Sequence, residues 1–497
     1  MQTEDSTGGA EGLHPTHEAL GVKRLRLHDV VAQSVGFMGP VFSSAFVIPL
    51  VIGIGSATGQ GGGLASPISV IIAAVGIFGL GWVIAQYARR IHAAGSLYDY
   101  VTEGFGERAG SAAGWLYYGG VMVLGAGLSL LIGGYIQSTI KSEFGAATMP
   151  PWAWTLVVIA ALTLIAYLGV QVSTRFQLAL ALISLTVLTI FFIYVIVKLG
   201  GANSARAFNP GAASDGWKGI FLGVLYGVLL FVGFETAANL AEETPNPKRE
   251  IPIAVMFTAA LALGYFVLAT YVEIAGFHFD MKAITAAAGA PVFALGAPAH
   301  AGGYGGVWID RLLELVVLFD MLAVNMGIFV SSSRGIFAMA RDRRIPAPLA
   351  RVAPRRGTPV VAIGVLTAFS VVAVVIDQFW TGLYALPGQP HYFALFAWGS
   401  TFGAFSMVVV YLVMCAGALR RLARGNAVLQ VAAVVGILIT AGAIFGSIYK
   451  VTAPTIWAPY LSLIWLGIGV AVTTVTLGRA RAVKASAGKA GGAMGPA

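Results

Sequence analysis

Charged residues are scarce in this sequence. Only 10% of the 497 residues are Asp, Glu, Lys or Arg, whereas 58% are hydrophobic. Soluble globular proteins carry about a quarter charged residues. Together with a mean hydropathy of +0.83, this composition excludes an ordinary soluble protein and predicts an all-α polytopic membrane protein in a lipid bilayer.

Cysteine is almost absent as well. The single Cys415 lies in an apolar run, which excludes a disulfide framework and a thiolate metal site. The seven histidines fall in the expected tails, loops or span edges, so no metal-binding or nucleophilic cluster is visible. We therefore expect no cofactor, no bound metal and no enzymatic activity.

Long apolar runs are abundant. Crossing about 30 Å of hydrocarbon takes about 20 residues of helix, and twelve stretches reach this length. The predicted spans are 29–55, 66–88, 110–140, 152–170, 176–199, 217–241, 251–275, 307–340, 358–376, 392–415, 428–449 and 457–478.

The basic residues are distributed unevenly between the two sides. Most of the 30 Lys and Arg lie in the two tails and in the even-numbered loops, which places both termini in the cytoplasm of a multi-pass protein of the plasma (inner) membrane. This bias accounts for the net charge of +9 without a nucleic-acid partner. Residues 1–27 and 479–497 are expected to be cytoplasmic tails, disordered up to about residue 22 and beyond residue 481. The outer linker 276–306 is expected to hold one short helix.

Two spans carry helix-breaking residues. In "GFMGP", Gly36 and Gly39 allow unwinding and Pro40 suits a first helical turn, so a half-helix is expected to begin near Pro40 or Val41. Span six has a second break at Gly233. Backbone freed at membrane depth is costly unless it lines a cavity or meets a ligand.

The two breaks lie five spans apart, which predicts two inverted repeats, 28–200 and 217–415, followed by two further spans over 428–478. Free N–H groups from Val41 onward can hold a carboxylate, and carbonyls released around Leu230 to Val232 can hold an ammonium group. The alternative interpretation is that these glycines and serines serve close helix packing.

Acidic residues inside spans are costly and usually face the bundle interior. Glu235 follows the second break, and we predict that it gains and loses a proton during transport. The alternative interpretation is that Glu235 only makes a structural hydrogen bond. In span eight, Asp320, Gly327, Ser331 and Arg334 share one inward helical face. Asp320 is a candidate for a proton path, for pairing with a basic group, or for an interhelical hydrogen bond.

Three segments resemble the amino acid-polyamine-organocation (APC) permeases. They are "FVGFETAANLAEETPNPKREIPIAV" (231–255), "AAGSLYDYVTEGFGERAGSAAGWLYY" (93–118) and "SSSRGIFAMARDRRIPAPLARVAPRRGTP" (331–359), and the likeness extends over about 28–478. The resemblance implies a five-plus-five inverted repeat with two extra helices. It also implies transport of amino acids or related amines by alternating access, driven by protons or by exchange.

The resemblance carries over to individual residues. Family members usually have G-x-G at the first break, whereas this chain has Gly39-Pro40-Val41-Phe42, in which Pro40 removes one amide donor. Glu235 matches an acidic position linked to proton coupling. The predicted substrate-binding residues flank the two breaks: Gly36, Phe37, Met38, Gly39, Val41, Phe42, Ser43, Leu230, Phe231, Val232, Gly233 and Phe234.

Residues in spans five and six bear on the charge of the substrate and on the identity of the coupling ion. The tryptophan gate of arginine exchangers would fall near Leu229, which favours a neutral or apolar substrate. Some proton-coupled relatives have a lysine in span five, but here the stretch "TRFQLALALISLTVLTIFF" (174–192) contains none, so the coupling ion stays open and sodium near Ser331 is an alternative to protons. Exchange without net ion coupling and a non-transporting membrane sensor are the competing functions.

Overall fold

The computed structural model describes residues 20, 25–56, 59–146, 149–287, 290–386 and 388–492, the last sixteen of these by their backbone only. Within these residues the secondary structure is helical and contains no β-strand, as the sequence predicted. Most of the N-terminal segment expected to be disordered lies outside the described residues, as do the last five residues of the chain.

In the described part of the chain, ten helices are long and apolar enough to cross a membrane. Each is built from one of the apolar runs recognised in the sequence. They are α4 (Ser66–Ala88), α6 (Glu107–Phe144), α7 (Pro151–Leu168), α8 (Val170–Leu199), α10 (Pro247–Ala275), α13 (Val307–Arg341), α14 (Val360–Phe379), α15 (His391–Gly417), α16 (Ala427–Gly446) and α17 (Trp457–Gly492).

Two interrupted segments complete the twelve predicted spans. The first is divided into α1 (Leu27–Met38), α2 (Pro40–Phe46) and α3 (Ile48–Ile52). The sixth consists of α9 (Gly216–Leu230) and the 3₁₀ helix η5 (Thr236–Glu243). Both lie where the sequence placed its helix breaks. The inverted-repeat relationship between the two halves stays a prediction.

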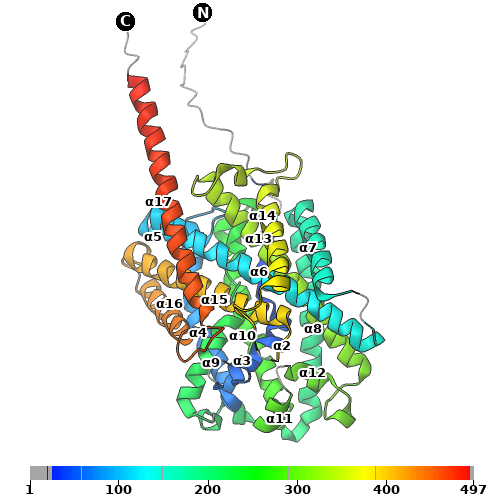
Figure 1. The fold of residues 1–497 in the computed structure, drawn as a ribbon. Helices are drawn as coiled ribbons and strands as arrows, with labels where there is room; N and C mark the ends of the chain where they lie inside the picture. The colour runs from blue at the N-terminus through cyan, green and yellow to red at the C-terminus, as the bar shows by residue number, and fades with distance from the viewer. Residues whose placement is uncertain are drawn as a thin grey trace, which may run out of the picture.

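Short helices connect the spans. Helix α5 (Leu97–Phe105) lies toward one end of the bundle, and α11 (Met281–Ala286) and α12 (Pro291–Gly296) lie at the other (Figure 1). The linker 276–306 thus contains two short α-helices where one was expected. The remaining short elements are η1 (Gly63–Ala65), η2 (Gly200–Ala202), η3 (Ala205–Phe208), η4 (Pro210–Ala212), η6 (Ala299–Ala301), η7 (Ala347–Ala350) and the π-helical turn η8 (Ala418–Leu422).

Helix α17 extends well past its predicted span. Its backbone stays helical to Gly492, so residues 479–492 form a helix where a disordered tail was expected. In Figure 1 this helix projects beyond the rest of the bundle.

Small residues let the central helices approach closely. A Cβ atom at Gly120 of α6 would lie 2.5 Å from the Cβ of Ser406, and one at Gly403 of α15 would lie 2.8 Å from the Gly120 carbonyl oxygen. Association of helices in lipid depends on such backbone proximity because burial of apolar side chains offers little advantage there. A Cβ atom at Gly125 of α6 would likewise lie 2.5 Å from a methyl carbon of Ile328 of α13, so α6 packs closely against both α13 and α15.

Candidate functional site

The first break is centred on Gly39. Helix α1 ends at Met38, Gly39 adopts a left-handed conformation with φ of 58°, and α2 begins at Pro40. Glycine tolerates this conformation, and proline is suited to the first turn because its missing N–H would be unpaired there. The Ser43 hydroxyl, expected to assist a ligand, donates instead to the Met38 carbonyl at 3.3 Å.

The second break is centred on Gly233. Helix α9 ends at Leu230, Gly233 has φ of 106°, and η5 starts at Thr236. Among the described residues, the carbonyls of Leu230 and Val232 accept no hydrogen bond. These two oxygens are free hydrogen-bond acceptors at the position where the sequence predicted acceptors for an ammonium group.

The two breaks lie against each other. A Cβ atom at Gly233 would collide with the Phe37 ring and lie 3.1 Å from the Met38 nitrogen. The Thr236 hydroxyl donates to the Gln33 carbonyl at 3.3 Å, and the Ala237 amide donates to the Ser34 hydroxyl at 2.9 Å. These bonds join α1 to η5.

The other predicted binding residues divide into two groups. Phe37, Met38 and Gly233 meet at the contact between the breaks, while Gly39, Val41 and Phe42 face α13. The side chains of two further candidates pack into other parts of the core: Phe231 lies edge-on to Phe266 at 5.4 Å, and Phe234 lies near Tyr411 at 6.5 Å.

Close packing explains part of the glycine pattern. A Cβ atom at Gly36 would lie 3.2 Å from the Gln177 Cβ, and one at Gly327 would lie 2.9 Å from the Phe37 Cα. Gly39 and Gly233 satisfy both interpretations of the sequence, because each has a left-handed backbone and also touches a neighbouring helix.

Glu235 is fully buried and hydrogen-bonded through both oxygens. Its Oε1 accepts from the Tyr117 hydroxyl at 2.6 Å, and its Oε2 accepts from the Gly233 amide at 3.1 Å. The carboxylate therefore holds the second break in shape and ties it to α6. Tyr117 was not predicted as a partner of Glu235, because the two residues are 118 positions apart and no sequence pattern links them.

Asp320 is fully buried on α13 and faces the start of α2. Its Oδ2 accepts from the Phe42 amide at 2.7 Å, and the Val41 amide also acts on this carboxylate. Two of the amides expected to bind a substrate carboxylate thus face a carboxylate of the protein. The other oxygen, Oδ1, has no hydrogen-bond partner among the described residues.

The rest of the predicted α13 face is confirmed as inward-facing. Ser331 donates to the Asn239 side chain at 2.9 Å, and Arg334 pairs with Glu243. Asn325 donates to Ser129 of α6 at 2.8 Å and so joins α13 to α6.

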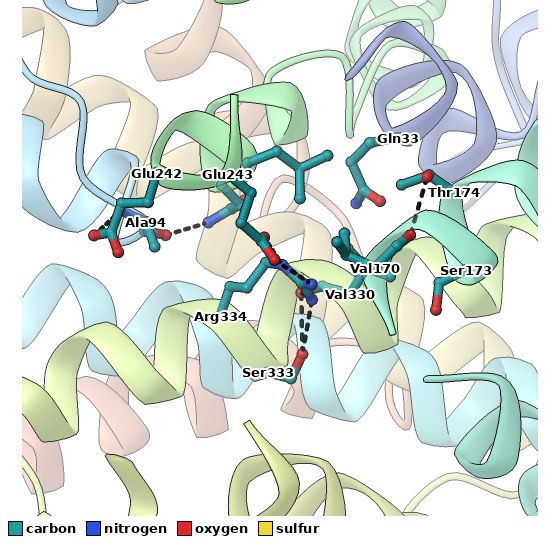
Figure 2. A network of polar contacts seen from close by, with 12 residues as sticks. Gln33, Ala94, Val170, Ser173, Thr174, Glu242, Glu243, Val330, Ser333 and Arg334 are labelled. Atoms are coloured by element: carbon teal, nitrogen blue, oxygen red, sulfur yellow. Dashed lines mark hydrogen bonds and ion pairs between the residues drawn. The ribbon is translucent and has the colours of Figure 1, made fainter. Parts of the chain in front are cut away.

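Arg334 anchors a polar network where α13 meets η5 (Figure 2). Its Nε and Nη2 donate to the two oxygens of Glu243 at 2.6 and 3.2 Å, and its Nη1 donates to the Val330 carbonyl at 3.1 Å. The side chains of Arg334 and Glu243 are only 4% and 3% exposed. This is a buried, two-pronged ion pair.

A second ion pair lies beside it. Arg341 donates to both oxygens of Glu242 at 2.8 Å, and Glu242 also accepts from the Ala94 amide at 2.9 Å. Arg341 is the last residue of α13, so this pair links that helix to η5.

Asp99 of α5 gives the stability a pH dependence. Burial, reinforced by Asp342 and Glu242 and opposed by Arg341, raises the pKa of Asp99 to about 7 from 3.8. The folded state therefore holds the proton more tightly than the unfolded state, so this group's contribution is complete below pH 3.8 and is lost as the pH rises to about 7.

We expect Asp99→Asn to raise the melting temperature at pH 8 and to leave it nearly unchanged at pH 5, because the amide cannot ionise. Thermal unfolding followed by size exclusion at a series of pH values would measure this. An equal shift at both pH values would show that Asp99 does not titrate in this range.

Comparison with known proteins agrees with this architecture. The amino acid permease family model matches residues 37–478. The chain is 25% identical over 358 residues to the branched-chain amino acid permease BcaP of Bacillus subtilis, covering 66% of this chain and 72% of that protein. It is 26% identical over 370 residues to BcaP of Lactococcus lactis, covering 72% and 76%.

A human protein, cationic amino acid transporter 4, is 26% identical over 362 residues, which cover 69% of this chain and 54% of that protein. The relatives thus include proteins named for branched-chain and for cationic substrates. Because the family match spans most of the sequence and the helices follow the expected pattern, this protein belongs to the amino acid permease family.

Proposed function

We propose that this protein is a secondary active transporter that carries amino acids or related amines across the plasma membrane by alternating access. The observation that carries the proposal is the contact between two broken spans, with free carbonyls at Leu230 and Val232 and left-handed backbone at Gly39 and Gly233. Backbone released at this depth is suited to a small polar ligand. Both termini are assigned to the cytoplasm by the positive-inside bias.

The side chains near the breaks favour a ligand with an apolar body. Phe42 lies edge-on to Phe396 at 5.6 Å, and Phe37 covers Gly233. Within the two interrupted stretches themselves, residues 36–43 and 230–236, Glu235 is the one acidic residue. We therefore propose a neutral or apolar side chain on the substrate.

Uptake into proteoliposomes tests this function. Labelled amino acids and amines are offered with and without an imposed pH gradient, and empty liposomes serve as the control. Specific uptake or counterflow of at least one compound is expected. Absence of both, with correctly inserted protein, would support the sensor interpretation instead.

Glu235 is proposed to couple transport to protons. Protonation would remove one of its acceptor functions and loosen the bond to Gly233 or Tyr117. The complete hydrogen bonding of Glu235 also favours a second candidate function, exchange without net ion coupling, in which this residue is purely structural.

Glu235→Gln separates the two candidates. We expect the variant to lose pH-gradient-driven accumulation while retaining exchange within about threefold, a change of less than about 1 kcal/mol in the barrier. Tyr117→Phe is the matched control because it removes one donor and leaves the carboxylate. Full accumulation by Glu235→Gln would contradict the coupling role.

A further inference from the structure

We infer that Asp320 binds the ammonium group of the substrate and makes the site prefer amines that lack an α-carboxylate over the matching amino acids. This inference rests on the proposed transport function. It assigns a substrate class and a specificity-determining residue to the same site.

A carboxylate of the protein already occupies the start of α2. Helix α2 has only seven residues, and its Phe42 amide already donates to Asp320 Oδ2 at 2.7 Å. Pro40 has no N–H to offer. A substrate carboxylate at this point would have to displace Asp320 and would meet its negative charge within a medium of low dielectric constant, where like charges repel strongly.

Asp320 Oδ1 is buried and has no hydrogen-bond partner in the described part of the chain. No Lys, Arg or His among the described residues acts electrostatically on this carboxylate. A buried polar group without a partner is costly, and a cation with N–H donors satisfies both the charge and the lone pairs.

A second buried acidic residue lies in the neighbourhood of Asp320. Tyr265 of α10 is bonded to the Ser44 hydroxyl at 3.2 Å and lies close enough to Asp320 and Glu273 to interact electrostatically with both. Glu273 is also fully buried, and neither of its oxygens has a partner among the described residues. Three of the four carboxyl oxygens of Asp320 and Glu273 thus have no partner among the described residues, which makes this region more favourable to a cation than to an anion.

Aromatic rings lie together at α2, the helix that Asp320 contacts. The ring of Phe42, whose amide holds Asp320, has its centroid 5.5 Å from that of Phe46 and 5.6 Å from that of Phe396. An inorganic ion would not use this aromatic surface, whereas an alkyl or aryl amine places its ammonium group on Asp320 and its apolar body against the rings. Since Asp320 is fully buried, the amine reaches it only when α2 and α13 separate during the transport cycle.

The test uses matched pairs in proteoliposomes: leucine with isopentylamine, and phenylalanine with phenethylamine, each as a competitor and as a counterflow substrate. We expect each amine to compete at least about tenfold better than its amino acid, the ratio for one charge-assisted hydrogen bond. This comparison uses the unaltered chain, so it does not depend on whether a variant folds.

Asp320→Asn keeps the size of the side chain and an acceptor for the Phe42 amide but removes the charge. We expect it to weaken amine binding about 10- to 100-fold and to narrow the gap between each amine and its amino acid. Glu314 is a partly exposed carboxylate on the same helix, and Glu314→Gln serves as the control. This variant should bind amines as tightly as the unaltered protein does.

The outcomes distinguish the two proposals. Transport of amino acids with no preference for amines and no effect of Asp320→Asn would overturn the inference and leave the proposed function intact. Failure to carry either class would overturn the proposed function. Competition by Na⁺ alone, lost in Asp320→Asn, would identify an inorganic cation site and also overturn the amine assignment.

Discussion

Arg334→Ala is expected to lower the free energy of unfolding by about 3–5 kcal/mol, because it leaves Glu243 buried without its partner. Both side chains are almost completely excluded from solvent, and the guanidinium makes two bonds to the carboxylate. Unfolding in mixed micelles with increasing SDS, followed by tryptophan fluorescence, would measure the change.

Two further variants test this explanation. Arg311 pairs with Glu143 where the side chains are 42% and 27% exposed, so Arg311→Ala is expected to cost less than about 1 kcal/mol. The double change Arg334→Met with Glu243→Leu removes both charges and should recover most of the lost stability. A double variant as unstable as Arg334→Ala would mean that the hydrogen bonds to Val330 and Ser333, not the stranded charge, dominate.

Gly233→Ala is expected to destabilise the protein by about 2–6 kcal/mol and to abolish substrate binding, because two costs act together. Its added methyl group would collide with the Phe37 ring, and overpacking of this kind costs about 1–3 kcal/mol. The left-handed conformation, with φ of 106°, adds about 1–3 kcal/mol of backbone strain for a residue with a Cβ.

Gly264→Ala provides the matched control. Gly264 lies within α10, and a Cβ atom added there would have nothing within 4 Å, so alanine should be neutral or slightly stabilising. Equal stability of the two variants in the same unfolding assay would show that the second break relaxes easily and is not held by its contact with α1.

The positions of the spans could be predicted well from sequence. The predicted limits of span two, 66–88, coincide with α4, and the breaks at Gly39 and Gly233 occur where glycine and proline interrupt apolar runs. These features depend on local composition and on the length needed to cross a bilayer. The extension of α17 was missed because its Ala, Gly and Lys content was taken as a sign of disorder.

The partners of the polar residues could not be predicted in the same way. Phe42 and Asp320 are separated by 278 positions and Glu243 and Arg334 by 91, so only the packing of helices brings them together. One signal was available and overlooked: Glu273 is an acidic residue inside span seven, which by itself marks a position of interest. The sequence also could not show that the Phe42 amide is already bonded to a carboxylate.

The bonds from Thr236 to Gln33 and from Ala237 to Ser34 have a mechanical consequence. They couple the two interrupted spans, so a rigid-body displacement of α1 carries η5 with it unless both bonds break. The buried Arg334–Glu243 pair ties η5 to α13 in turn. Any such displacement therefore either carries α13 along or separates an ion pair that salt screens only weakly.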